Sequence, residues 1–433
     1  MIALYRVIVG LLFWTLFPVL LLIVILSGKH RRGLGERLAL ATPVIRSSKS
    51  GAIIWIHAAS IGEVRAARIV IDHCTRNWPE SSVVLTTMTI HGRDYARTIL
   101  PDSVFCLLAP LDVPFVVERA IKRLRPTIYV CLETELWPLL VAALHRRGIG
   151  TALLNGRIST RSLPRYRRWR TLFGTVLNCF DGIGVISDED RSRFLEIGAD
   201  SSRLRVTGNI KYDYPPPHRR EGVTQRYRKR LSLEAGDEVF IAGSTHSPEE
   251  RLLLEEFGGR PDLQEMVWLI APRHLKRVAE IEALLAQMKI GYDKLSTLSE
   301  EYSRRHRLVL VDTMGDLADL YEVGTYIFIG GSIAEYGGHN LMEAARRHKP
   351  VFFGPHVEDF KDGATALIDQ GGGFQIDSAT DLFTHIEQLY HNRNSLTAAG
   401  QAAGKVAGSC RGAVGRQMEI IGEIFDEKSK NER

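Results

Sequence analysis

The sequence predicts an α/β protein with two Rossmann-like lobes that face a cleft, preceded by an N-terminal membrane-anchor helix. Three observations lead to this prediction. Short β-branched runs alternate with amphipathic stretches, the alternation stops at a proline-rich and charged stretch and then restarts, and residues 7–28 carry no charged side chain. The 433 residues suit two domains better than one core.

The composition is that of an ordinary folded protein. Hydrophobic residues make up 45% and charged residues 24%, which argues against a disordered or polytopic chain. The five cysteines are widely spread without a CxxC pair, which predicts reduced thiols rather than a disulfide framework or a zinc cluster. A formal net charge of +6 favours an anionic partner without identifying it.

The uncharged N-terminal run is long enough to cross a hydrocarbon layer of ~30 Å. A signal peptide is the alternative, but the run is longer than the usual h-region and no small-x-small site precedes Lys29. Because Lys29, Arg31 and Arg32 follow, the positive-inside rule predicts a single-pass anchor over residues 1–28 with the rest in the cytoplasm. Pro18 leaves open a helix that lies partly in the interface.

The first lobe is predicted over residues 29–213. Its expected strands are residues 52–57, 82–87, 127–132, 151–154 and 181–186, and helical stretches follow at 63–78, 91–100 and 136–147. Residues 214–236, which contain three consecutive prolines, are predicted to be a linker.

The second lobe is predicted over residues 237–405, with strands at 238–242, 266–270, 307–311, 326–329 and 351–353. In such sheets, ligands bind at the carboxyl ends of the strands. The cleft between the two lobes is therefore the expected site.

Glu63 is the candidate catalytic base of the first lobe. It follows the first strand in His57-Ala58-Ala59-Ser60-Ile61-Gly62-Glu63 and enters the next helix. Ser60 and Glu63 have capping-box spacing, so a purely structural carboxylate is an equal alternative. In the functional interpretation, Gly62 leaves room for a ligand and Glu63 accepts the proton of an attacking sugar hydroxyl.

Glu133 and Lys211 are the other candidates in this lobe. Glu133 ends an apolar strand, where an unpartnered acid costs desolvation energy, and this favours a role in the cleft. Lys211 ends the lobe and could reach the same cleft, although a solvated lysine is the more common outcome. Glu135 fits a helix N-terminus and is expected to be structural.

In the second lobe, several polar or glycine-containing turns follow strands. Arg273 after Pro272 suits a pair of phosphate oxygens, whereas Ser244 and Thr245 in Gly243-Ser244-Thr245 form a weaker phosphate-binding signal. Gly330-Gly331-Ser332 and Gly337-Gly338-His339-Asn340 precede a helix with Glu343, which predicts a nucleotide site. We find no P-loop, HExxH motif or spaced acidic pair that indicates a bound metal.

A basic cluster lies in the first lobe. It is either a solvated helix face or a surface for a phosphorylated, acylated acceptor and anionic lipid headgroups. No nucleic-acid-binding motif accompanies it, so nucleic acid is not expected as a partner. The cluster comprises Arg161, Arg165, Arg167, Arg168 and Arg170 together with Tyr166 and Trp169.

Taken in order, these segments resemble the Kdo (3-deoxy-D-manno-octulosonic acid) transferases of lipopolysaccharide inner-core assembly over nearly the whole chain. Further marks of the resemblance are Thr86-Thr87-Met88-Thr89, Asp312-Thr313-Met314-Gly315 and Phe353-Gly354-Pro355-His356.

The resemblance implies a GT-B fold and an inverting transfer of Kdo from CMP-Kdo to a lipid A precursor at the inner membrane, without a metal or other cofactor. It implies that Glu63 is the base and that Glu133 and Lys211 support the transition state. It also implies that residues 406–433 return to the first lobe. The residues that it assigns to CMP binding are Pro272, Arg273, Met314, Gly315, Asp316, Asn340 and Glu343.

Three departures from the family pattern concern the nucleotide contacts. Leu341-Met342 replaces Pro-Leu after Asn340, Asp316 replaces a Glu, and Asn155-Gly156-Arg157 replaces Asn-Ala-Arg. Because fold alone does not define chemistry, the alternatives are a related membrane-associated enzyme that uses a UDP- or ADP-sugar, a nucleotide-sugar epimerase and a non-catalytic membrane scaffold.

Overall fold

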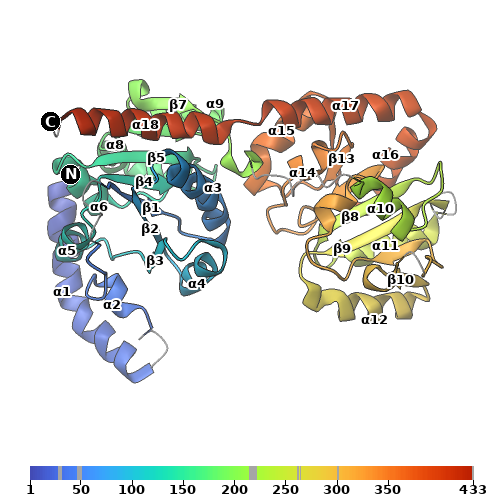
Figure 1. The fold of residues 1–433 in the computed structure, drawn as a ribbon, viewed down its shortest axis with the longest axis horizontal. Helices are drawn as coiled ribbons and strands as arrows, with labels where there is room; N and C mark the ends of the chain where they lie inside the picture. The colour runs from blue at the N-terminus through green and yellow to red at the C-terminus, as the bar shows by residue number, and fades with distance from the viewer. Residues whose placement is uncertain are drawn as a thin grey trace. The chain divides into compact units, whose positions relative to one another are not determined.

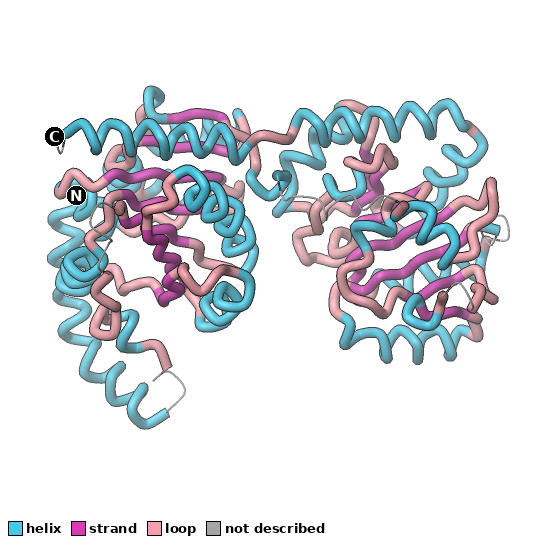
Figure 2. Tube along the Cα trace, in the orientation of Figure 1, coloured by secondary structure: helices cyan, strands magenta, loops and turns pink. Residues whose placement is uncertain are grey.

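The computed structural model describes residues 1–27, 32–45, 51–213, 222–260, 263, 265–299 and 302–431. The chain forms two compact units. Unit 1 comprises Met1–Tyr214 and Gly412–Arg433, and unit 2 comprises Pro215–Arg411. Figure 1 traces the chain through its elements, and Figure 2 shows the strands of each unit with helices around them.

Unit 1 contains a seven-stranded parallel sheet in the order β3-β2-β1-β4-β5-β6-β7. The central strands are buried along their whole length, as expected for a sheet covered on both faces. The strands are β1 (Ile53–His57), β2 (Ser82–Thr87), β3 (Phe105–Leu108), β4 (Ile128–Leu132), β5 (Gly150–Gly156), β6 (Gly182–Val185) and β7 (Leu204–Val206).

Side chains alternate between the two faces of this sheet. In β1, Trp55 joins one apolar cluster with α5 (Pro114–Leu124) and α6 (Pro138–Arg146). Ile54 and Ile56 join another with α3 (Ile61–Asn77) and α18 (Ala413–Asn431). The helices of unit 1 are α1 (Ile2–Ser27), α2 (Leu34–Arg37), α3 (Ile61–Asn77), α4 (Ile90–Ile99), α5 (Pro114–Leu124), α6 (Pro138–Arg146), α7 (Leu163–Arg168), α8 (Arg170–Leu177), α9 (Asp188–Ile197) and α18 (Ala413–Asn431), with 3-10 turns η1 (Ser201–Arg203) and η2 (Ile210–Asp213).

Helix α1 is the one described helix that is long and apolar enough to cross a membrane, judged by length and composition. It lies along unit 1 beside α5 (Figure 1). Tyr5, Val9, Phe13 and Phe17 pack against the unit 1 core. The spacing of four residues places these side chains on one face of the helix.

Helix α18 belongs to unit 1 although it ends the chain. Asp213 accepts hydrogen bonds from the backbone N–H groups of Gly412 (2.8 Å) and Val414 (2.6 Å). Arg416 donates to the carbonyl of Thr207 (2.9 Å). The chain is thus tied to unit 1 both where it leaves that unit and where it returns.

Unit 2 contains a second seven-stranded parallel sheet in the order β10-β11-β9-β8-β12-β13-β14. Its strands are β8 (Val239–Thr245), β9 (Val267–Pro272), β10 (Tyr292–Lys294), β11 (Leu308–Leu310), β12 (Tyr326–Ile329), β13 (Val351–Phe353) and β14 (Gly373–Gln375). The helices are α10 (Val223–Arg230), α11 (Glu249–Gly259), α12 (Val278–Met288), α13 (Leu317–Leu320), α14 (Met342–Ala345), α15 (Lys361–Asp369), α16 (Ala379–His391) and α17 (Arg393–Ser409), with 3-10 turns η4 (Leu275–Arg277), η5 (Leu295–Thr297) and η6 (Glu358–Phe360).

The fold class predicted from the sequence is confirmed, because each unit is a parallel sheet between helices. Part of the predicted linker, residues 214–221, lies outside the described residues, as do Lys29 and Arg31 of the basic flank. The rest of the predicted linker contains helix α10.

Candidate active site

Glu63 lies at the carboxyl edge of the unit 1 sheet, in the first turn of α3. Its side chain is 7% exposed. The Ser60 hydroxyl caps the helix by accepting from the Glu63 N–H (3.2 Å), and Glu63 Oε2 accepts from the Ala59 N–H (2.7 Å). Within the described part of the chain, no donor reaches Oε1. The carboxylate therefore serves as a cap and keeps one oxygen for a further partner.

The surroundings of Glu63 make it a stronger base than an ordinary carboxylate. Burial raises its pKa to about 7, and the nearby negative charge of Glu133 adds to this effect, while the bond from Ala59 opposes it. A carboxylate with a pKa near neutrality accepts a proton more readily than one near 4.

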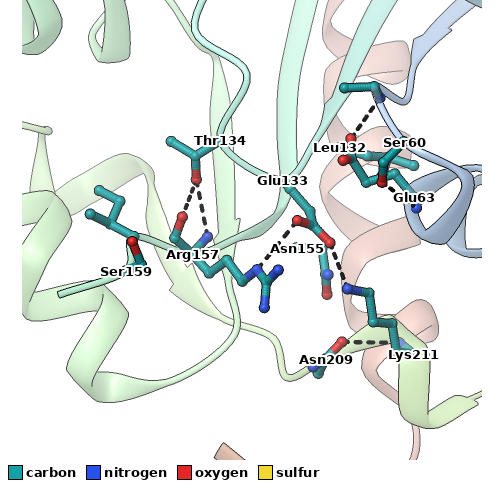
Figure 3. A network of polar contacts seen from close by, with 12 residues as sticks. Ser60, Glu63, Leu132, Glu133, Thr134, Asn155, Arg157, Ser159, Asn209 and Lys211 are labelled. Atoms are coloured by element: carbon teal, nitrogen blue, oxygen red, sulfur yellow. Dashed lines mark hydrogen bonds and ion pairs between the residues drawn. The ribbon is translucent and has the colours of Figure 1, made fainter. Parts of the chain in front are cut away.

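Glu133, Lys211 and Arg157 form one charged cluster (Figure 3). The Lys211 Nζ atom lies 2.8 Å from Glu133 Oε1, and Arg157 Nε lies 3.3 Å from Oε2. The three side chains are only 13–29% exposed. The structure thus brings the predicted residues Glu133 and Lys211 together, and it adds Arg157, which our prediction did not select as a site residue.

The backbone at this cluster is strained. Glu133 and Asn155 follow or end neighbouring strands and have φ values of 58° and 55°, in the left-handed region. Such a conformation costs about 1–2 kcal/mol for a residue with a Cβ atom. Asn155 Oδ1 also accepts from the Ile210 N–H (2.9 Å), which fixes the segment that carries Lys211.

A buried aromatic network supports the loop before Glu63. The Trp137 indole N–H donates to His57 Nε2 (3.4 Å), so the proton of His57 is on Nδ1, which faces Thr86 Oγ1 at 3.0 Å. Burial lowers the pKa of His57 to about 4. His57 is therefore neutral and positions the end of β1.

Glu135 does not lie at a helix N-terminus, contrary to our prediction. Helix α6 begins at Pro138, and the Asp112 carboxylate accepts from the N–H groups of Leu139 (3.0 Å) and Leu140 (2.8 Å). Asp112 lies in an earlier loop, so the sequence around α6 could not show that this residue caps the helix. Burial and the charge of Glu133 raise the pKa of Glu135.

In unit 2, Ser244, Thr245 and Arg273 lie at the ends of the neighbouring strands β8 and β9. Ser244 is the extra residue of a β-bulge and has a φ of 58°. The Arg273 N–H donates to the Thr245 carbonyl (3.0 Å). These contacts hold the Ser244 and Arg273 segments side by side at the edge where parallel sheets bind ligands.

Three histidines gather at this edge beside Arg273. His246 Nε2 lies 3.1 Å from His339 Nε2, and the rings of His246 and His274 are 5.9 Å apart. Burial and the charge of Arg273 lower the pKa of His339 to about 3. Our prediction did not single out His246 and His274, although each directly follows a motif that it did use, Gly243-Ser244-Thr245 or Pro272-Arg273.

Glu249 accepts hydrogen bonds from the turn Gly330-Gly331-Ser332, which the sequence predicts to be part of a nucleotide site. Its buried carboxylate accepts five of them, from His246 (2.9 Å), Gly331 (2.8 Å), Ser332 (3.0 Å), Ile333 (3.0 Å) and Ala334 (3.2 Å). The glycine-containing loop is thus organised by an internal anion. The N–H groups of Gly331 and Ser332 are therefore occupied within the protein, and the nucleotide site stays a prediction.

The remaining predicted donor residues lie on loops of unit 2. Asp316 accepts from the hydroxyls of Tyr227 and Thr313, and Asn340 Oδ1 accepts from the Met342 N–H (3.1 Å). Met314 is 74% exposed, and Gly315 has a φ of 92°. Pro272 is the buried last residue of β9, and Glu343 lies in the short helix α14.

The basic cluster of unit 1 lies on α7 and α8, except for Arg161, which precedes α7, and Trp169, which lies between the two helices. Tyr166 is buried, whereas Trp169 is 51% exposed. Arg167 pairs with Glu196. The described residues contain no group of three or more His, Cys, Asp or Glu side chains that could hold a metal ion.

Two Rossmann-like units, each with charged residues at the carboxyl edge of its sheet, define the fold class as GT-B. A solved glycosyltransferase from Rickettsia africae has a TM-score of 0.58 at 15% identity, covering 89% of this chain and all of that one. At this identity the likeness shows the fold alone.

The family model for 3-deoxy-D-manno-octulosonic-acid transferase (kdotransferase) matches residues 32–214. A 3-deoxy-D-manno-octulosonic acid transferase of Haemophilus influenzae is 30% identical over 398 residues, covering 91% of this chain and 92% of that protein. The C-terminal CMP-Kdo binding domain of WaaA from Acinetobacter baumannii is 25% identical with a TM-score of 0.39, covering 43% of this chain and 96% of that one. The chain belongs to the Kdo transferase family and is a glycosyltransferase.

Proposed function

We propose that the chain transfers Kdo from CMP-Kdo to a lipid A precursor of the lipid IVA type, with inversion at the anomeric carbon, in lipopolysaccharide core biosynthesis. One observation carries the mechanism. Glu63 is a buried carboxylate at the carboxyl edge of the sheet, with a pKa raised to about 7 and one oxygen that no described donor occupies.

In the proposed reaction, Glu63 takes the proton of an acceptor hydroxyl. The resulting oxygen nucleophile forms a bond to the anomeric carbon of Kdo, while the bond from that carbon to the phosphate oxygen breaks and CMP leaves. Glu63 then releases the proton to solvent. One base suffices for this direct displacement.

The cluster around Glu133 supports the transition state in this proposal. Lys211 and Arg157 contribute two positive charges against the one negative charge of Glu133. The guanidinium of Arg157 and the ammonium of Lys211 are donors suited to a substrate that carries a carboxylate, as Kdo does, or phosphates, as the acceptor does. Because the three groups hold one another, they need little reorganisation during the reaction.

Unit 2 binds CMP-Kdo in this proposal. Arg273 suits the phosphate oxygens because its guanidinium offers paired donors. His246, His274 and His339 can add hydrogen bonds to the departing CMP phosphate. The further contacts that we propose for the nucleotide come from Pro272, Ser244, Thr245, Met314, Gly315, Asp316, Asn340 and Glu343, and the proposal requires no metal.

The attachment of the enzyme to the inner membrane, with both units on the cytoplasmic side, is also a proposal. Helix α1 and the basic residues that follow it support it. The sequence predicts a single pass, and the acceptor would approach over the basic cluster of α7 and α8.

A mass-spectrometric assay with CMP-Kdo and a tetra-acylated lipid A precursor tests the proposed function. We expect a product that is heavier by Kdo, together with released CMP. A donor panel is the control, because turnover with a UDP- or ADP-sugar and none with CMP-Kdo would favour the alternative enzymes. A chain that releases no CMP in the presence of acceptor and donor would support the non-catalytic scaffold.

The rate of transfer is expected to rise through about pH 7. Glu63 acts only when ionised, and because its pKa is raised, that form is lost as the pH falls below about 7 rather than below about 4. The measurement is kcat from about pH 5 to about pH 9. Glu133→Gln removes a negative charge that raises this pKa, so the midpoint of its profile is expected at a lower pH. A flat profile over this range would contradict the role of Glu63.

A further inference from the structure

A hollow of about 600 Å³ lies in unit 1 between α1 and α5. Helix α1 contributes Arg6, Gly10 and Trp14 to its lining. Helix α5 contributes an aromatic end at Phe115 and a basic end at Lys122 and Arg123, with Arg119 between them. Aromatic side chains of the two helices meet, since the rings of Trp14 and Phe115 are 5.4 Å apart.

The lining of the hollow is strongly positive. Two of its four cations donate a hydrogen bond to a backbone carbonyl: Arg119 to that of Leu38 (3.2 Å) and Arg123 to that of Thr42 (2.7 Å). A carbonyl is neutral, so these bonds leave the two positive charges uncompensated. Within the described residues, neither Arg6 nor Lys122 forms an ion pair. Glu118 also lines the hollow, but its charge is balanced by a pair with Arg147.

The outer face of α1 is apolar and exposed. Leu4, Leu11 and Leu12 are 59%, 63% and 52% exposed, and Val7 is 58% exposed. A soluble surface rarely keeps such a continuous apolar strip, whereas lipid would cover it. The face of α1 that bears Tyr5, Val9, Phe13 and Phe17 is covered by protein instead.

The packing of α1 argues against a simple crossing of the bilayer. Residues 5–17 contact unit 1 over about 18 Å, more than half of a ~30 Å hydrocarbon layer. If α1 crossed, the cations of α5 beside it would enter the hydrocarbon, where charged side chains are unfavourable. A helix that lies along the membrane surface avoids this cost.

We propose that α1 lies in the membrane surface and that the hollow binds the headgroup phosphate of an anionic phospholipid in the same leaflet. The four cations match the phosphate, and Trp14 and Phe115 suit the boundary between headgroups and acyl chains. This arrangement differs from the single pass predicted from the sequence. It rests on the proposed attachment to a membrane but not on the proposed sugar transfer.

The first test is flotation of the full-length protein with vesicles, without CMP-Kdo or acceptor. Binding to phosphatidylcholine vesicles that contain about one third phosphatidylglycerol is expected to exceed binding to pure phosphatidylcholine vesicles. In Arg6→Gln/Lys122→Gln, this preference should fall about five-fold for each cation lost. The matched control is Arg251→Gln/Lys405→Gln, which removes two exposed cations of unit 2 and should keep the preference.

The outcomes separate the two proposals. Equal binding to both vesicles, or an unchanged preference in Arg6→Gln/Lys122→Gln, would overturn the headgroup site while the attachment stands. Failure to bind either vesicle would overturn the attachment and the headgroup site with it. Formation of a dimer through α1 in place of vesicle binding would identify a second copy as the occupant and also overturn the site.

The second test asks whether α1 stays on α5 in the membrane. The rings of Phe13 and Phe115 are 5.0 Å apart, so Phe13→Cys/Phe115→Cys is expected to react with a short bismaleimide both in detergent and in vesicles. Leu12→Cys/Phe115→Cys is the control, because Leu12 is on the exposed face and should not be linked. Loss of the link in vesicles would show that α1 leaves α5, which overturns the proposal.

Discussion

Glu63→Gln is expected to lower kcat for Kdo transfer by about 10²–10⁴-fold, the usual contribution of a general base. Gln keeps the shape of the side chain and can still accept the bond from the Ala59 N–H, but it cannot take a proton. Donor binding should be unchanged, because the proposed donor site is in unit 2. Single-turnover kinetics and calorimetric titration with CMP-Kdo measure the two effects separately.

The thermal stability of Glu63→Gln shows whether its loss of activity comes from the missing base or from a damaged fold. At about pH 8 the parent carries an ionised, buried Glu63 whose raised pKa means that the charge costs folding energy. The Gln variant lacks that charge, so its Tm at this pH should equal or exceed that of the parent. Glu135→Gln is the matched control, since it neutralises a neighbouring half-buried acid and should keep most activity. Parental activity in Glu63→Gln would show that the base lies elsewhere.

Glu249→Ala is expected to destabilise unit 2 severely. The variant removes the acceptor of five backbone N–H groups. If water replaces the carboxylate at three of them, the other two still leave about 2–6 kcal/mol uncompensated, a large part of a domain stability of about 5–15 kcal/mol. The measurements are thermal unfolding and hydrogen exchange at residues 331–334.

Glu255→Ala is the control for this variant, because it removes an exposed acid from the same helix and should change the free energy of unfolding by less than about 0.5 kcal/mol. Glu249→Gln should be intermediate, since one of its two terminal atoms still accepts while its NH₂ group faces donors. Exchange at residues 331–334 that is as slow in Glu249→Ala as in the parent would contradict the proposed role of Glu249.

The sequence predicts the inner strands of both sheets but none of the four outermost ones. The missed strands β3, β7, β10 and β14 are the edges of the two sheets. They have three or four residues each and are partly exposed, as in Leu204-Arg205-Val206. The continuous apolar run that identifies a strand buried on both faces is therefore absent from them.

Local sequence locates candidate side chains better than it assigns their partners. The cost of burying an acid predicted that Glu133 has a role in the cleft, but its pairing with Lys211 was not predicted. The position of Glu63 followed from its place after a strand. The function of Glu249 was not visible, because four of the five amides that it binds are more than eighty residues away in the chain. The predicted start of α6 was wrong for the same reason, because Asp112, which caps this helix, lies in a distant loop.

Unit 2 is an insertion within unit 1, because the chain leaves unit 1 after Tyr214 and returns to it at Gly412. A nonsense mutation or protease cut shortly after Gly412 would remove the helix that covers one side of the first sheet, and with it apolar partners such as Ile420, Ile421 and Phe425. Loss of residues 413–431 is thus expected to unfold the part that carries Glu63. Residues 215–411, by contrast, form an uninterrupted segment that could be expressed alone or exchanged between relatives.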